Sequence, residues 1–300
     1  MEQIQNNRVI TDLYRENAQF PGIALDGSDV YLCWQRFVDR HDSLMASCRR
    51  GDEVVWEREI SDGGEVLHPV ILAHGGAIWY AWSEYARENW RILARCYRDG
   101  QWGEVLTVAS GEALFFPRLF TWQGRLHVIW TEQHKGSAAA VLCPLTEAGP
   151  GAAETVSAVG EAYRAGAAEG GDGNLYVAYD GFDGKQYKLF ARARTAAGWS
   201  KEIVVSQGED WASTPWIAAK PDGAVVGWYD YGYMAVYSVR SADLTVRDGA
   251  LAAVNPQCLK EGVDWYLDLH VASNASGLQA MAYTRSKYDV LVLSLIHISE

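Results

Sequence analysis

The sequence predicts an all-β fold, a six-bladed β-propeller whose blades each hold four strands. The main evidence is a recurring phrase: a turn containing glycine, an alternating apolar run, an aromatic anchor and, soon after it, a charged residue. Clear copies are GGAIWYAWSE, which ends at Glu84, and QGRLHVIWTE, which ends at Glu132. The six anchors are Trp34, Trp82, Trp130, Tyr179, Trp228 and Tyr283. They are 48, 48, 49, 49 and 55 residues apart, and such a period is typical of propeller blades.

A second landmark has the same period as the anchors. A proline lies 13 residues before the anchor in four of the repeats, at Pro21, Pro69, Pro117 and Pro215. Tight-turn dipeptides are a third landmark, since Asp26-Gly27 and Asp172-Gly173 each precede an alternating apolar run. Separate landmarks that move together support one repeated structural unit.

The strands of each blade are expected in the same order along the chain. In the first blade, from Phe20 to about Ser61, PGIAL, VYLCW, SLMASC and VVWEREI supply the four strands. The other blades are expected at Val66–Ser110, Phe115 to about Val159, Tyr163–Ser206, Thr214 to about Val254, and from near Trp265 onward. We expect a linker over residues 255–264, which would account for the 55-residue step.

The N-terminal segment is expected to close the ring. Residues 8–13, RVITDL, alternate like a strand but precede the first repeat. Similar segments end the later repeats, such as KEIVVS at Ser206. The N-terminal strand would therefore complete the last blade, and closure would remove the exposed edges that an open array leaves.

The repeat spans nearly the whole chain, so residues 1–292 are predicted to form a single propeller domain. Hydrophobic residues make up 49% of the 300, and 13 Trp and 16 Tyr provide material for a continuous core. The last eight residues, LSLIHISE, resemble the translation of a transposase adapter used in sequencing libraries. We treat residues 293–300 as an adapter-derived artefact tail and expect the natural protein to continue differently after Val292. A downstream domain is one continuation left open.

Charge and composition exclude several classes of partner. The net charge of -12 argues against nucleic acid and against an anionic membrane surface, because both need clustered cations. No apolar run approaches the roughly 20 residues that span a bilayer. The N-terminus lacks the pattern of a secretory signal, so a cytoplasmic location is expected. The five cysteines are expected to be buried thiols, and since no metal-binding spacing is present, no metal or cofactor is expected.

A motif between the third and fourth strands carries a family resemblance. Glycine is followed by tryptophan at Gly51 with Trp56, Gly100 with Trp102, and Gly198 with Trp199. The stretch RCYRDGQW, residues 95–102, resembles the Asp-box (BNR) motif of sialidase-like propellers, in which a Ser, an Asp, a Gly and a Trp close a hairpin. Ser is missing here, and only the second blade has both Asp and Gly near the Trp. The resemblance implies a six-bladed, sialidase-like fold and does not imply sialidase activity.

Candidate site residues follow from the repeat. The loop after the second strand and the loop into the first strand emerge on one face of a propeller, at the mouth of the central channel. Two residues after each anchor, the ring reads Arg36, Glu84, Glu132, Gly181 (with Asp180 just before it), Asp230 and Arg285. The entering loops add His68, Phe115, Phe116, Arg118, Tyr163, Arg164, Trp211, Trp216, Trp265 and Tyr266, and the fifth blade adds Tyr231. We expect Glu84, Glu132 and Asp230 to converge there, opposite the two arginines of the ring.

Carboxylates beside aromatic rings suit a sugar, because rings stack on pyranose faces while acids accept hydroxyl hydrogen bonds. The predicted partner is a glycan or a small polar or acidic ligand. One reading is a carbohydrate-binding or scaffolding propeller, an N-terminal module of a longer protein. The other is a glycoside hydrolase that uses Glu84, Glu132 and Asp230 as catalytic carboxylates. A third reading of each acid is structural: it satisfies backbone donors of the next blade, and the aromatic residues pack between blades.

The sialidase resemblance adds one requirement. A retaining sialidase needs three arginines on the substrate carboxylate, a tyrosine nucleophile paired with a glutamate, and an aspartate as acid/base. Arg36, Arg118, Arg164 and Arg285 could supply the arginines. No motif selects a tyrosine, so the resemblance extends to the fold alone, and binding is favoured over catalysis.

Overall fold

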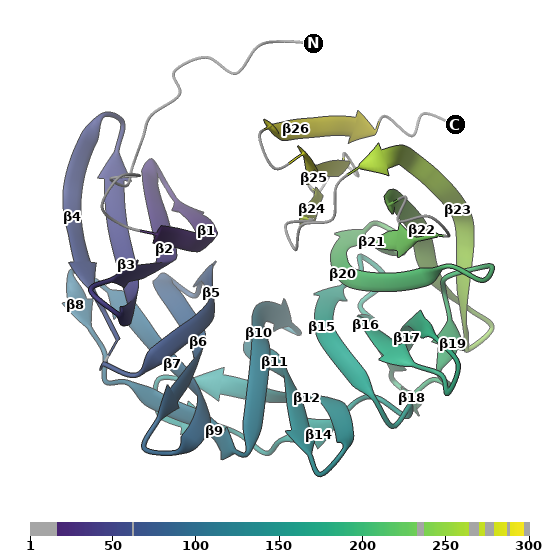
Figure 1. Ribbon diagram of the computed structural model, residues 1–300, viewed down its shortest axis with the longest axis horizontal. Helices are drawn as coiled ribbons and strands as arrows, with labels where there is room; N and C mark the ends of the chain where they lie inside the picture. Colours follow the sequence, from purple (N-terminus) through teal and green to yellow (C-terminus); the bar gives the residue numbers. More distant parts are fainter. Residues whose placement is uncertain are drawn as a thin grey trace.

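Antiparallel sheets surround a central axis in the computed structural model (Figure 1). The structure describes residues 17–61, 63–232 and 237–263, together with the backbone of residues 270–273, 279–286 and 289–296. The predicted closing strand at residues 8–13 lies outside the described residues. Within the described ranges, no helix has the length and apolarity needed to cross a membrane.

Each of the first five sheets has four strand positions, with the first strand nearest the axis (Figure 1). The first sheet contains β1 (Asn17–Asp26), β2 (Asp29–Val38), β3 (His41–Arg50) and β4 (Glu53–Glu59). The second contains β5 (Glu65–His74), β6 (Ala77–Ala86), β7 (Asn89–Arg98), β8 (Gln101–Trp102) and β9 (Leu106–Gly111). The third contains β10 (Ala113–Trp122), β11 (Arg125–His134), β12 (Ser137–Thr146), β13 (Gly149–Pro150) and β14 (Glu154–Thr155).

The fourth sheet contains β15 (Ala162–Glu169), β16 (Leu175–Phe182), β17 (Tyr187–Thr195), β18 (Gly198–Trp199) and β19 (Ile203–Val204). The fifth contains β20 (Trp211–Lys220), β21 (Gly223–Tyr231), β22 (Tyr237–Arg247) and β23 (Ala250–Val263). In the second, third and fourth sheets the outermost position is split into two short strands, which both pair with the third strand. A further sheet of β24 (His270–Ser273), β25 (Gln279–Ser286) and β26 (Asp289–Ile296) follows, and β24 packs beside β20.

The predicted fold class is confirmed as an all-β, propeller-like arrangement of five four-stranded antiparallel sheets. The linker predicted at residues 255–264 is wrong. Nearly all of that stretch belongs to β23, a 14-residue strand whose pairing with β22 contains several register shifts. The 55-residue step therefore comes from a long, bulged outer strand, because residues inserted into a strand can be absorbed as bulges without ending the pairing.

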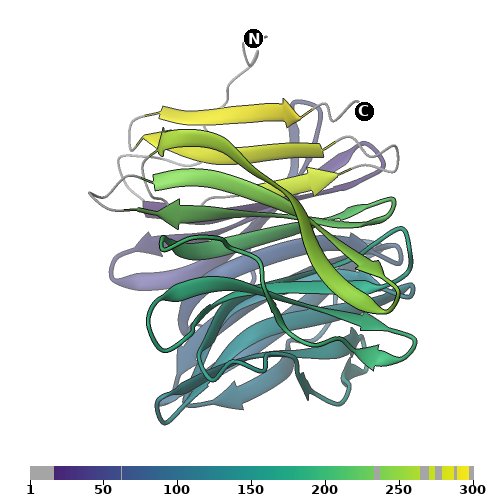
Figure 2. The same ribbon diagram turned by 90° about the vertical axis from the view of Figure 1, so that its right-hand side faces the viewer.

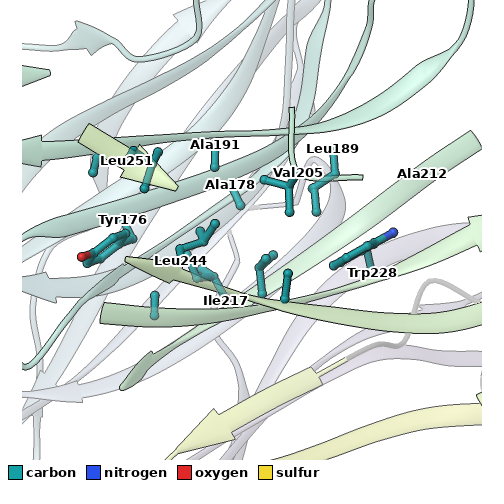
Figure 3. Close-up of a cluster of buried hydrophobic side chains, with 14 residues drawn as sticks. Tyr176, Ala178, Leu189, Ala191, Val205, Ala212, Ile217, Trp228, Leu244 and Leu251 are labelled. Atoms are coloured by element: carbon teal, nitrogen blue, oxygen red, sulfur yellow. The ribbon is translucent and has the colours of Figure 1, made fainter. Parts of the chain in front are cut away.

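The core lies between the sheets, which stack face to face around the ring (Figure 2). Trp82 in β6 packs toward the first sheet, in a cluster with Tyr31 and Leu44. Trp79, three residues earlier, packs toward the third sheet with Val128. Figure 3 shows the same arrangement between the fourth and fifth sheets, where Tyr176, Ala178 and Leu189 meet Trp228, Leu244 and Ile217. Because both faces of a second strand are buried, the predicted anchors are inter-sheet packing residues.

Four of the five cysteines are buried thiols, as expected, and Cys258 is exposed. Burial raises the pKa of Cys33 to about 12 and that of Cys143 to about 11, so both stay protonated. Cys48 and Cys96 pair with residues three before their anchors, whereas Cys143 pairs with a residue two before its anchor. Cys143 is therefore one position out of step with Cys48 and Cys96 and faces the opposite side of its sheet.

Candidate functional site at the axis of the ring

A β-bulge interrupts the first strand of each of the five four-stranded sheets. Inside every bulge lies one non-glycine residue with a left-handed backbone: Phe20 (φ 52°), His68 (φ 54°), Phe116 (φ 55°), Arg164 (φ 44°) and Thr214 (φ 57°). We call these five residues the bulge ring. In four of the five, the next residue is the periodic proline of the sequence. Proline fits there because the extra residue of a bulge leaves the hydrogen-bond ladder.

Contacts between neighbouring sheets link the bulge ring around the axis. The imidazole centroid of His68 lies 4.9 Å from the ring of Phe20 and 4.2 Å from that of Phe116. The guanidinium of Arg164 lies 5.9 Å from the centroid of Phe116. Because the first strands are the innermost strands (Figure 1), the side chains of four sheets meet close to the axis.

Arg118 connects two sheets that are not neighbours. It lies in β10, two residues after Phe116, and its guanidinium is 3.9 Å from the centroid of Trp216 in β20. β15 lies between β10 and β20 (Figure 1), so this cation–π contact joins the third and fifth sheets past the first strand of the fourth. Arg118 and Trp216 both keep part of their surface exposed. We call Arg118, Trp216 and the bulge-ring residues His68, Phe116 and Thr214 the axial site.

The axial site is positively charged and incompletely hydrogen-bonded. Burial lowers the pKa of Arg118 to about 10, which leaves the guanidinium charged at neutral pH, and among the described residues no carboxylate pairs with it. Burial, together with the charges of Arg118 and Arg164, lowers the pKa of His68 to about 3, so its imidazole is neutral. Within the described part of the chain, His68 Nδ1 and Thr214 Oγ1 are buried without a partner. Such groups favour a ligand that brings negative charge and hydrogen bonds.

The second strands extend past their anchors, and two predicted acids are consequently buried in strands. Glu84, in β6, is 0% exposed, accepts a hydrogen bond from Trp82 Nε1 at 3.2 Å and is ion-paired with Arg91. Asp230, in β21, is 3% exposed, accepts from Trp228 Nε1 at 2.6 Å and is ion-paired with Arg240. The expectation that these positions lie in loops is wrong, because the strands continue to Ala86 and Tyr231.

The other predicted ring members also have partners in their own sheets or face outward. Arg36 is 3.3 Å from Glu59 of the same sheet. Glu132, near the end of β11, is exposed and borders a cavity of about 270 Å³. Arg285 lies in β25, and its side chain is outside the described residues. The predicted acids are therefore held within separate sheets, and whether they contact a ligand stays a prediction.

Asp180 has a different role, because it follows its anchor by one residue and faces the next sheet. It is 0% exposed, and its two carboxylate oxygens each accept a hydrogen bond from Arg164 Nε at 3.0 Å. Burial raises its pKa, while Arg164 and the backbone N–H of Thr214 oppose that rise. In the third sheet Thr131 occupies the same position, and its Oγ1 accepts the backbone N–H of Arg164 at 3.0 Å. The residue after an anchor thus supports the neighbouring bulge, which is the structural reading given above for an acid at this position.

No family model and no curated protein matches the sequence. Among solved structures, the chain is similar to the NanB sialidase from Streptococcus pneumoniae, with a TM-score of 0.61 and 7% identity over 95% of this chain and 68% of that one. The Kuenenia stuttgartiensis hydrazine synthase gives a TM-score of 0.56 and 12% identity over 99% and 100%. A puromycin-hydrolyzing peptidase from Mycobacterium tuberculosis gives a TM-score of 0.54 and 15% identity over 89% of this chain and 42% of that one.

The fold is that of a sialidase-like β-propeller. At such low identities the similarity concerns the fold alone, and the three similar proteins have three different activities in their names. The function of this sialidase-like propeller must therefore be argued from its own residues.

Aromatic residues predicted for the site cluster on the fourth and fifth sheets. Trp211 is the first residue of β20 and is 48% exposed. Tyr231 ends β21, and its ring stacks on that of Tyr237 at 4.6 Å. Two members of the bulge ring, Phe20 and Thr214, were missed from the sequence. The signal was available, since each immediately precedes a periodic proline.

Proposed function

We propose that this sialidase-like propeller binds an acidic carbohydrate at its axis, with Arg118 as the receptor for the anionic group. One observation carries the proposal: the guanidinium of Arg118, on an inner strand, lies on the ring of Trp216 two sheets away, and no described carboxylate neutralises it. An enclosed charge without a counter-charge is costly. A ligand carboxylate would remove that cost with charge-assisted hydrogen bonds.

The remaining groups of the axial site suit a sugar. Neutral His68 and Thr214 offer unpaired polar atoms to hydroxyl groups. The exposed parts of the Phe116 and Trp216 rings add apolar surface for the C–H face of a pyranose, while the Arg118 guanidinium lies on the Trp216 ring. Arg164 is paired with Asp180, which fixes its position and neutralises its charge, so Arg118 is the cation left for an anionic group.

Binding is favoured over glycoside hydrolysis. A hydrolase needs two carboxylates facing each other across the substrate, about 5 to 9.5 Å apart. Glu84 and Asp230 are instead neutralised by arginines of their own sheets, and Glu132 is exposed on the third sheet. We therefore infer a binding module.

We also propose that β24–β26 is a sixth blade and that residues 8–13 add its outer strand. The support is an exposed apolar strand: Ile23 in β1 is 64% exposed, whereas its equivalents Ile71 and Leu119 pack against the preceding sheet. The first sheet needs such a neighbour, and Figure 1 shows β26 and β1 flanking the same gap. Deleting residues 1–13 should lower the melting temperature and cause aggregation. A monomer with an unchanged melting temperature would contradict closure.

The binding proposal is tested by calorimetric titration of the full chain with D-glucuronate, D-galacturonate and N-acetylneuraminate, with glucose as the neutral control. At least one acidic sugar should bind more tightly than glucose. Arg118→Met should weaken that binding at least tenfold, while Arg98→Met, a surface arginine paired with Glu147, should not change it. Equal binding of acidic and neutral sugars, or full binding by Arg118→Met, would overturn the proposal.

A further inference from the structure

A row of aromatic side chains crosses the end of the fourth and fifth sheets. Phe182 ends β16 and Tyr187 begins β17, with their ring centroids 5.5 Å apart. Tyr187 is 5.6 Å from Trp211, the first residue of β20. In the backbone register, Trp211 is opposite Tyr231 and Tyr231 is opposite Tyr237. Directly opposed residues share one face of an antiparallel sheet, so the row continues across three strands of the fifth sheet.

We call Phe182, Tyr187, Trp211, Tyr231 and Tyr237 the aromatic belt. It lies at the end of the propeller where first strands begin and second strands end, and Figure 1 shows that β16 and β17 adjoin β20 to β22. Tyr163 connects it to the axis, because its ring is 6.2 Å from Tyr187 and it immediately precedes Arg164 of the bulge ring. Arg164 in turn lies 5.9 Å from the ring centroid of Phe116, which links the belt to the axial site.

Packing alone does not explain the belt. Trp211 is 48% exposed, and an exposed indole contributes little to a core. The scaffold does not require it either. Four sheets have the landmark proline, and in each the first strand begins four residues before it. That first residue is Asn17, Glu65 and Ala113 in the first three sheets, and tryptophan only in the fifth sheet. The comparable rings Tyr85 and Trp90 of the second sheet are half-buried, as are the other four rings of the belt, so the exposed indole of Trp211 is what distinguishes the belt.

We propose that the aromatic belt is a second carbohydrate subsite, so that the ligand is a chain of sugars running from the axis over the fourth and fifth sheets. This inference rests on the proposed function and specifies its ligand class. Flat, uncharged rings bind the apolar faces of pyranoses, whereas the anionic group of the chain is bound at the axis by Arg118. The chain length that the protein prefers then depends on the belt.

The test measures the affinity of the full chain for D-galacturonic acid, its linear tetramer and neutral cellotetraose, by calorimetry and by tryptophan fluorescence. The wild-type protein should bind the acidic tetramer at least tenfold more tightly than the monomer. Trp211→Ala should reduce tetramer binding to the monomer level and leave monomer binding unchanged. Phe37→Ala, which removes a 43% exposed ring from the first sheet, is the matched control and should have no effect. Trp211→Phe should retain most of the tetramer affinity, which separates ring stacking from folding.

Failure of the belt and failure of the axial site are distinguishable. Equal affinity for monomer and tetramer, or an unaltered tetramer affinity in Trp211→Ala, would overturn the belt and leave the axial site standing. Binding of cellotetraose that depends on Trp211 and not on Arg118 would support the belt and refute the acidic ligand. Absence of binding to all three probes would overturn both.

Discussion

Two sets of positions recur around this propeller. In one set the side-chain contacts repeat, and in the other only the backbone conformation repeats. Two residues after the anchor, the second and fifth sheets share one arrangement: a buried carboxylate accepts the anchor indole N–H and pairs with an arginine, as at Glu84 and Asp230. In the bulge ring the backbone repeats, with φ between 44° and 57°, but the side chain changes at every step, for example from His68 to Phe116 to Arg164.

The difference separates scaffold from candidate site. A side-chain arrangement that recurs with the repeat meets a structural requirement of every blade. Here the requirement is a hydrogen-bond acceptor for the anchor indole N–H, which is buried between sheets. In the bulge ring the backbone fixes where the side chain is placed, whereas the residue type can differ from blade to blade and so can be selected for binding. We therefore expect substitutions at Glu84 or Asp230 to affect stability and substitutions in the axial site to affect binding.

The largest expected effect comes from two arginines of the axis. Arg164→Met should lower the free energy of unfolding by about 3 to 5 kcal/mol, because it leaves the fully buried Asp180 without its cation. Arg118→Met should leave stability unchanged or raise it by up to about 2 kcal/mol, because it removes a charge without a described counter-ion. Urea denaturation measures both, and equal losses in the two variants would contradict the distinction.

Glu84 and Glu132 occupy the same repeat position and provide a second matched pair. Glu84→Gln should cost about 2 kcal/mol of unfolding free energy, since Arg91 loses its counter-charge while the amide oxygen can still accept from Trp82. Glu132→Gln should stay within about 0.5 kcal/mol, because Glu132 is exposed. If chemical denaturation gives similar losses of unfolding free energy for the two variants, then the burial of Glu84 does not make it more important for stability than Glu132.

The free energy of unfolding should depend on pH through His68. The pKa of His68 is lowered to about 3, so between pH 6.5 and 3 the unfolded chain binds a proton that the folded protein excludes. The stability contributed by neutral His68 is present above pH 6.5 and is lost as the pH falls. Because one pKa unit is worth about 1.4 kcal/mol and His68 is partly exposed, we expect a loss of about 2 kcal/mol relative to His68→Gln.

The measurement is the difference in unfolding free energy between wild type and His68→Gln across that pH range. Burial raises the pKa of Asp180, so its contribution runs in the opposite direction and is lost as the pH rises. Asp180 is present in both proteins and cancels in the difference. A difference that stays constant with pH would mean that His68 titrates normally.

Much of the fold could be predicted from the sequence, because packing between sheets imposes a regular pattern on the chain. Trp82, Trp130 and Trp228 are buried for the same reason in each sheet, and the anchors record that constraint directly. The length of a strand beyond its anchor leaves no comparable trace. Glu84 was therefore expected in a loop, although β6 continues to Ala86.

The candidate site was predicted only in part. Arg118, Arg164 and Trp211 were recognised as residues of the entering segments, but their partners could not be deduced. Arg118 meets Trp216 past the first strand of the fourth sheet, and no local pattern encodes a contact between sheets that are not neighbours. Pairing of Arg164 with Asp180 likewise depends on which side of the strand each residue faces.

The smallest expected effect tests whether the periodic prolines mark the bulges. In the fourth sheet Ala165 follows Arg164 at the position that Pro69, Pro117 and Pro215 occupy after their own bulge residues. If the bulge geometry is the same, Ala165→Pro should raise the free energy of unfolding by about 0.5 to 1 kcal/mol, because proline restricts the unfolded chain and the site loses no ladder hydrogen bond.

Two further substitutions serve as controls for the proline position after the bulge. Pro117→Ala should lower stability by a similar amount, because it reverses the same change in a neighbouring sheet. Ala178→Pro should cost about 3 kcal/mol or more, because Ala178 pairs with β15 on one side and β17 on the other and its N–H belongs to a regular ladder. Thermal and urea denaturation of the three variants give the ranking. If Ala165→Pro is as harmful as Ala178→Pro, then the fourth bulge differs from the others and Arg164 is placed by Asp180 alone.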